Sequence, residues 1–193
     1  MSKLRGSLFA LTLLFAALAH ADIDVAGVKF ADHAKLGAAT LALNGAGMRN
    51  KFFFKVYAMA LYLPQPQRDA AAVLAMPGAE QIRIVTLREL TARQFADALV
   101  EGIRKNYPEA ERAPLASRLA AFEAKMLALK TAAEGAVIEI DWLPGDGTRL
   151  VVNGEQQGED IPGEDFYRAL LKIWLGDKPA AQDLKEALLG HAH

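Results

Sequence analysis

The stretch NGAGMRNKFFFKVYAMALYL, residues 44–63, joins a glycine-rich start to a long apolar and aromatic run. Aromatic and β-branched side chains favour a strand over a helix from Phe52 to Leu63, and Pro64 ends that strand. Gly45 and Gly47 permit a bulge, or a close approach of the backbone to another group. The stretch therefore predicts a long strand next to an unusual backbone feature.

Outside this stretch, the pattern predicts further strands and several helices. Residues 81–87 alternate apolar side chains between two faces, as strands do. The other strands are expected at residues 23–30, 38–43, 136–143 and 148–152, and the helices at residues 69–76, 91–108, 114–130, 163–175 and 179–190. This order of strands, helices, a hairpin and more helices indicates an α+β domain, in which helices cover one face of an antiparallel sheet.

Two short motifs mark boundaries between these elements. Thr91 and Gln94 match a capping box, in which each side chain satisfies a backbone N–H at the start of a helix. The Pro-Gly-Asp-Gly sequence of residues 144–147 predicts the turn of the hairpin.

The first 21 residues match a cleavable secretory signal. Lys3 and Arg5 precede an apolar run, and the Ala-His-Ala sequence of residues 19–21 is typical of a cleavage site. The apolar run is shorter than the ~20 residues that span a bilayer. We therefore expect residues 1–21 to be removed, and one domain, residues 22–193, to act in the periplasm without stable membrane insertion.

Composition excludes several classes of site. The chain has no cysteine, which excludes disulfides, thiolate metal sites and a cysteine nucleophile. Removal of Lys3 and Arg5 with the signal leaves 20 of the 22 basic residues against 23 acidic ones, a balance that indicates neither nucleic acid nor an anionic membrane surface. His191 and His193 are typical of a frayed tail. No metal or cofactor is expected.

No standard catalytic motif is present. The sequence has no Gly-x-Ser-x-Gly, no phosphate-binding glycine loop and no His-Glu-x-x-His. Ser117 is the one serine beyond the signal, and it lies inside a predicted amphipathic helix. Ser-His-Asp catalysis is therefore not expected.

Arg49 admits two interpretations from its chemistry alone. In the first, Arg49, Asn50 and Lys51 form a solvated hairpin turn. In the second, the guanidinium faces an apolar cavity, where it requires an anionic or strongly accepting partner. Tyr57 would then add a phenolic donor to the same anion. Spacing alone does not decide between them.

The central stretch also carries a family resemblance. Residues 45–49 (GAGMR) and 55–63 (KVYAMALYL) resemble the signature of chalcone isomerase-like domains. Residues 161–171 and 173–179 resemble the C-terminal part of the bacterial branch of that family. The resemblance extends over residues 24–190. It implies an open-faced β-sandwich, in which a large antiparallel sheet and a helical layer form a ligand cleft.

Two activities occur in the family. Its plant enzymes close chalcones to flavanones with an arginine, threonines, a tyrosine and an asparagine, whereas non-catalytic relatives hold a fatty-acid carboxylate with arginine and tyrosine. Arg49 keeps the arginine, and Tyr57 replaces a threonine of the enzymes, as in the fatty-acid binders. The tyrosine and asparagine of the enzymes fall at Phe95 and Gly102, and their later threonine falls near Tyr167. The resemblance thus implies a kept carboxylate clamp and a mostly missing catalytic set.

Three hypotheses follow from these observations. The first is a binder of a fatty acid or similar hydrophobic carboxylate. The second is an isomerase or intramolecular lyase on a flavonoid-like enone, with Tyr57 and Tyr167 as its acid–base candidates. The third is an envelope protein that binds another protein and has a vestigial cleft. The candidate ligand-binding residues are Arg49, Phe54, Tyr57, Met59, Phe95 and Tyr167, with Phe52 as a further wall residue.

Overall fold

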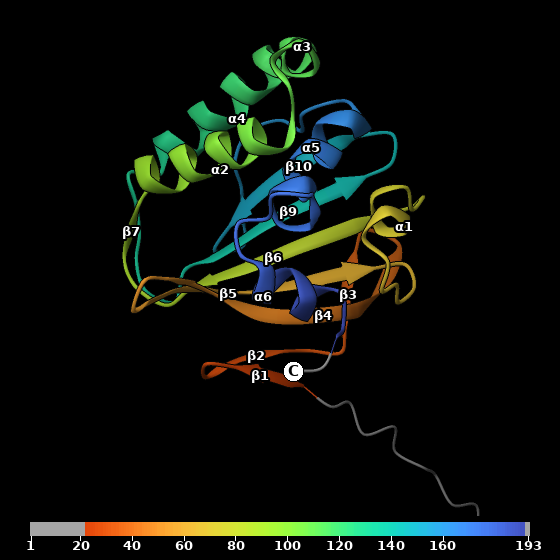
Figure 1. The fold of residues 1–193 in the computed structure, drawn as a ribbon, viewed down its shortest axis with the longest axis vertical. Coiled ribbons are helices and arrows are strands. Elements are labelled where there is room, and N and C mark those ends of the chain that lie inside the picture. The colour runs from red at the N-terminus through yellow and green to blue at the C-terminus, as the bar shows by residue number, and fades with distance from the viewer. Residues whose placement is uncertain (1–21, 192–193) are drawn as a thin grey trace, which may run out of the picture.

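The computed structural model describes residues 22–191, so the predicted signal segment and His193 lie outside the described residues. A seven-stranded antiparallel sheet forms the centre of the molecule, in the order β11-β10-β9-β6-β5-β4-β3 (Figure 1). Its strands are β3 (His33–Leu36), β4 (Ala39–Lys51), β5 (Phe54–Leu63), β6 (Glu80–Thr86), β9 (Val137–Leu143), β10 (Gly147–Val152) and β11 (Glu155–Gln156). Two short pairs are separate from it: β1 (Ile23–Val25) with β2 (Val28–Phe30), and β7 (Leu90–Thr91) with β8 (Thr131–Ala132).

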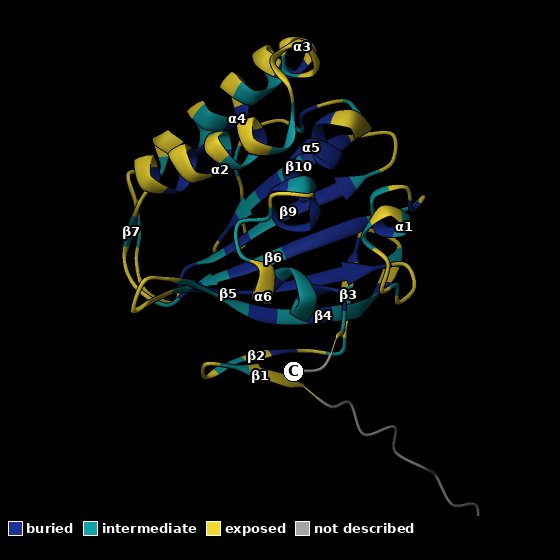
Figure 2. Ribbon diagram, viewed as in Figure 1, coloured by how far each residue is buried: buried dark blue, intermediate teal, exposed yellow. Residues whose placement is uncertain are grey.

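The helices lie on one face of the sheet in two layers. The inner helix, α5 (Glu164–Leu175), is almost wholly buried, and it contacts both β10 and the outer helix α2 (Ala92–Asn106). Next to α2 lies α4 (Ala116–Ala128), and both expose their outer surfaces (Figure 2). The shorter helical elements are α1 (Ala70–Leu74), α3 (Glu109–Arg112), the 3-10 turn at Ala113–Leu115 and α6 (Gln182–Leu188). The expected α+β arrangement is confirmed.

Several predicted boundaries are wrong. The helix expected at residues 179–190 is α6, which begins at Gln182, and the strand expected at residues 38–43 continues to Lys51 as β4. Two further errors have local causes. The helix expected at residues 114–130 is preceded by α3 and a 3-10 turn, because Pro114 has no N–H to continue an α-helical ladder. The strand expected to begin at Phe52 begins at Phe54. Lys51 pairs with Phe54, which leaves Phe52 and Phe53 as a two-residue turn. Within residues 22–191, no helix is both long enough and apolar enough to cross a bilayer.

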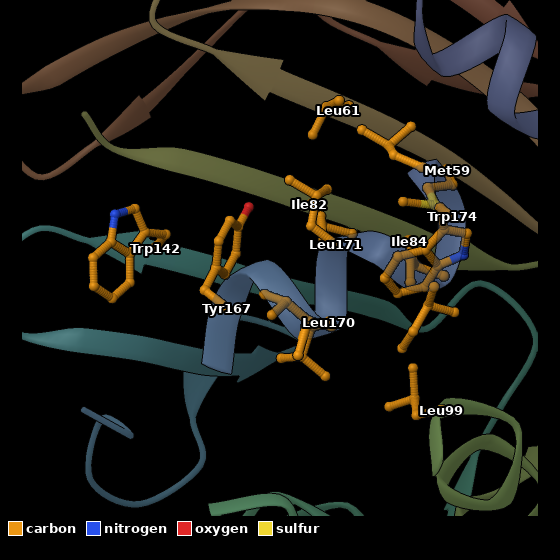
Figure 3. Close-up of a cluster of buried hydrophobic side chains, with 14 of the residues drawn as sticks. Met59, Leu61, Ile82, Ile84, Leu99, Trp142, Tyr167, Leu170, Leu171 and Trp174 are labelled. Carbon is orange, nitrogen blue, oxygen red and sulfur yellow. The ribbon is translucent and has the colours of Figure 1, made fainter. Parts of the chain in front are cut away.

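The main core lies between the sheet and α5 (Figure 3). Strand side chains such as Met59, Ile82 and Ile84 are fully buried there, as are Leu170 and Leu171 of α5. A smaller apolar cluster on the opposite face brings β2 and β3 against β4 and β5. The central strands are therefore covered on both faces.

Two glycines let α6 pack directly on the backbone of β4. A Cβ at Gly45 would overlap the carbonyl oxygen of Ala187, and a Cβ at Gly47 would lie 2.7 Å from the Ala187 Cβ. Any side chain at either position would push α6 away from the sheet. The close backbone approach expected from the glycine-rich motif is therefore confirmed, and its partner is α6.

Asn44 holds the same junction through its side-chain amide. Its Nδ2 donates to the carbonyl oxygens of Gln67 and Leu188, at 2.9 and 2.7 Å. Its Oδ1 accepts from the Gln67 backbone N–H at 2.6 Å. One side chain thus ties β4 to the segment after β5 and to the end of α6.

Two carboxyl groups are buried on opposite faces of the sheet. Burial raises the pKa of Glu80 to about 7, although Arg168 donates to it at 2.6 Å and opposes the rise. Burial also raises the pKa of Asp141 to about 6, partly opposed by a 2.9 Å hydrogen bond from Gln81. Both carboxyl groups therefore bind their proton more tightly in the folded chain than in the unfolded one.

These raised pKa values predict that the protein is more stable at pH 5 than at pH 8. A raised folded pKa gives stability that is complete below the unfolded pKa and is lost as pH rises through the folded one. Asp141→Asn removes one carboxylate that the fold disfavours, so we expect it to raise the unfolding free energy at pH 8 by about 1–3 kcal/mol. Chemical denaturation at several pH values measures this.

The matched control for this experiment is Glu155→Gln on the exposed strand β11, which should leave the pH dependence unchanged. If the unfolding free energy of Asp141→Asn depends on pH in the same way as that of the unmodified protein, burial of Asp141 does not cause this pH dependence.

Candidate binding site

A cavity of about 480 Å³ lies between the β4–β5 hairpin and α2. The end of α5 and the loop before α6 complete its lining. This volume falls within the ~300–1,000 Å³ that small-molecule sites occupy. The cavity therefore has the size of a ligand pocket.

Arg49 lies on the wall of this cavity. It pairs with Tyr57 across β4 and β5, immediately before a register shift at Asn50. Its guanidinium is half-buried and donates to the Asn50 carbonyl oxygen. Among residues 22–191, no carboxylate forms an ion pair with it. The hairpin turn lies further on, at Phe52 and Phe53, so Arg49 is a strand residue next to a cavity.

The Tyr57 hydroxyl is held in place by Trp174. Trp174 lies near the end of α5, and its indole N–H donates to the Tyr57 oxygen at 2.9 Å. Burial raises the pKa of Tyr57, while the Trp174 hydrogen bond and the charge of Arg49 oppose that rise. Within the described chain, no acceptor takes the Tyr57 hydroxyl proton. Tyr57 therefore stays protonated and has a donor available for a ligand.

Trp174 was not among the residues predicted for the site. One feature of the sequence could have indicated it: Trp174 lies near the end of an otherwise apolar helix face, and a buried indole N–H needs a hydrogen-bond acceptor. Trp174 and Tyr57 are separated by 117 positions. Only the docking of α5 on the sheet brings them together.

Two predicted aromatic residues contribute to the cavity wall. Phe95 of α2 meets Tyr57 edge to face, with ring centroids 6.4 Å apart and an interplanar angle of 74°. Phe54, at the start of β5, lies under the guanidinium of Arg88, which is 5.0 Å from the ring centroid. Phe52 also lines the cavity. The wall near Arg49 is therefore aromatic.

Met59 and Tyr167 lie outside the lining of this cavity. Met59 follows Tyr57 by two residues on the same face of β5, which carries it into the core, where it is fully buried. Tyr167 precedes Trp174 by about two helical turns. It stacks on Trp142 near the other end of α5, with ring centroids 6.0 Å apart (Figure 3). Both residues therefore belong to the core in this structure.

The cavity lining is electropositive. It includes several cationic side chains and one carboxylate, that of Glu101, which forms ion pairs with Arg104 and Lys105. The cationic residues are Arg49, Lys51, Arg88, Lys105 and Lys178. Low-dielectric walls strengthen the attraction of such a site for an anion. No cluster of His, Asp or Glu in residues 22–191 is arranged to hold a metal ion.

Comparisons with known proteins agree with this architecture. A fatty-acid binding protein of Arabidopsis thaliana has a similar fold, with a TM-score of 0.67 and 16% sequence identity over 88% of this chain and 96% of that chain. A search of curated protein sequences finds no match. A family model described as chalcone isomerase-like matches residues 22–190. The chain therefore belongs to the chalcone isomerase-like family.

Proposed function

We propose that this protein is an exported, non-catalytic binder of a fatty acid or a similar apolar carboxylate. The observation that carries the proposal lies on the wall of an aromatic cavity: within residues 22–191 the Arg49 guanidinium has no counter-ion, and the neighbouring Tyr57 hydroxyl donates to no acceptor. Arg49 would form the charge-assisted bonds to the carboxylate, and Tyr57 would donate a further hydrogen bond. The Arabidopsis structure with a similar fold is itself described as a fatty-acid binding protein, which supports the proposal.

The energetics suit an ordinary metabolite binder. Burial of a tail of about ten methylenes gains roughly 8 kcal/mol, at ~0.8 kcal/mol for each. Association costs several kcal/mol, and the hydrogen bonds to the headgroup offset part of that cost. The balance corresponds to a dissociation constant in the micromolar range.

Three features weigh against the isomerase alternative. The raised pKa of Tyr57 disfavours the phenolate that a general base would need. Tyr167 lies in the core, away from the cavity lining. At Gly102, where the family's enzymes have asparagine, a Cβ would lie 2.6 Å from the Ile173 Cγ2. The close contact of α2 with α5 leaves no room for that catalytic amide.

Export remains part of the proposal. The signal-like pattern of residues 1–21 supports export. The absence of cysteine is compatible with it, because the protein then needs no disulfide to fold in the periplasm. N-terminal sequencing of the protein recovered from a periplasmic extract would test it, and a mature chain that begins at Asp22 is the expected result.

Loss of the clamp should weaken fatty-acid binding without unfolding the protein. We expect Arg49→Gln to raise the dissociation constant of oleate about 10- to 100-fold, because a charge-assisted bond is replaced by a neutral one. Tyr57→Phe should have a smaller effect, about 5- to 10-fold, because one neutral donor is lost. Isothermal titration calorimetry measures both changes, and native mass spectrometry shows whether a bound acid is retained on purification.

Arg83→Gln is the matched control. Arg83 lies on β6, pairs with Glu139 at 3.1 Å and does not line the cavity, so oleate binding should be unaffected. If Arg49→Gln and Arg83→Gln bind oleate equally well, Arg49 does not hold the carboxylate.

The protein should not accelerate the ring closure of a chalcone. Because Tyr57 is protonated and Tyr167 lies in the core, neither acid–base candidate is placed to take the substrate proton. The absorbance of a chalcone should decay at the uncatalysed rate in its presence. A saturable acceleration that Tyr57→Phe abolishes would instead assign an isomerase activity.

A further inference from the structure

The turn between β4 and β5 exposes three consecutive phenylalanines. Phe52, Phe53 and Phe54 are 86, 100 and 60% exposed. Exposed large apolar side chains occur singly on most soluble proteins, and adjacent ones mark an interaction site. We call Phe52, Phe53 and Phe54 the aromatic tip. Figure 2 shows the connection between β4 and β5 as exposed.

The backbone of the turn makes this exposure costly. Phe52 has a φ of +55°, in the left-handed region that Gly and Asn adopt most readily in two-residue hairpin turns. A bulky aromatic residue is strained in that conformation. The local fold thus places an unfavourable residue where it reaches solvent, which indicates that the exposed aromatic group itself has a role.

The charged residues that flank the aromatic tip along the chain, and the one whose side chain contacts it, are positive. Lys51 and Lys55 flank it along the chain, and Arg88 lies over the ring of Phe54. Residues 49–55 include three basic side chains and no acidic one. The overall composition of the chain conceals this feature, because acidic side chains elsewhere balance the total charge.

We propose that the aromatic tip docks this protein reversibly on the surface of an anionic lipid bilayer. Aromatic side chains partition into the interface between lipid headgroups and acyl chains, and nearby Lys and Arg are attracted to anionic headgroups. A protein partner is less well matched, because a stable protein interface needs about 800 Å² on each side and a two-residue turn presents a narrow point. A narrow turn can insert its side chains into a bilayer without a surface of matching shape, because lipids rearrange around them.

Docking in this way would bring the cavity to the membrane. Phe52 and Phe54 belong both to the aromatic tip and to the cavity lining. Insertion of the aromatic tip would therefore set the cavity mouth at the headgroup level, where a fatty acid could pass between bilayer and cavity. This consequence rests on the proposed function, whereas docking itself does not.

Phe53 provides the cleanest test, because it is fully exposed and does not line the cavity. Phe53→Ser should weaken co-sedimentation with vesicles of phosphatidylethanolamine and phosphatidylglycerol about 10-fold or more. Leu127→Ser, which removes an exposed apolar side chain on α4, is the matched control and should bind as the unmodified protein does. Added salt, or vesicles of phosphatidylcholine alone, should also weaken binding.

A second variant reports insertion directly. Trp142 and Trp174 are both buried. The tryptophan fluorescence of the Phe53→Trp variant, minus that of the unmodified protein, therefore comes from the aromatic tip. That emission should shift to shorter wavelength on addition of anionic vesicles. No vesicle binding by the unmodified protein, or equal binding by Phe53→Ser, overturns the proposal. Self-association through the aromatic tip without vesicle binding, measured by analytical ultracentrifugation, also overturns it and assigns the tip to protein contacts.

Oleate binding by Phe53→Ser separates the two proposals. Because Phe53 does not line the cavity, its loss should leave oleate affinity in solution unchanged while vesicle binding falls. Vesicle docking that depends on Phe53, in a protein that does not bind oleate, would support docking and refute the proposed ligand.

Discussion

The close contact between the glycine-rich part of β4 and α6 is the constraint on which the site depends. Gly45 and Gly47 have no side chain, and this lets α6 lie against the backbone of the sheet. That position of α6 sets the short connection that leads back to the end of α5. Trp174 lies on α5 just before this connection, and the docking of α5 on the sheet brings its N–H to the Tyr57 hydroxyl. The glycines thus set the position of α6 and of the loop before it, whose Lys178 and Ala180 line the cavity, and Arg49 follows them on the same strand.

A second consequence of this packing concerns α2 and α5. Gly102 allows α2 to approach Ile173 closely, which places Phe95 against Tyr57. The contact that shapes the wall also removes the space for a polar side chain at position 102. The aromatic wall and the lack of space at position 102 therefore have one cause, the close packing of α2 on α5.

Local patterns in the sequence predicted most of the elements. The capping box at Thr91 forms as expected, with its Oγ1 accepting from the Gln94 N–H at 3.1 Å. The error at Phe52 has a physical cause, because aromatic residues favour strands while cross-strand pairing of Lys51 with Phe54 decides where the turn falls. The resemblance identified Arg49, Tyr57 and Phe95 at the cavity. Trp174 could not be predicted, because its role depends on how a helix distant in sequence docks on the sheet.

The hydrogen bond from Trp174 also limits what the polar end of the cavity can recognise. With that bond in place, Tyr57 offers a hydrogen to a ligand, and a guanidinium has only hydrogens to offer. A methyl ester or a fatty alcohol could still accept hydrogen bonds from Arg49 and Tyr57, but neither carries the negative charge that Arg49 matches. The pocket would thus sort long-chain molecules by their headgroups before chain length had any effect.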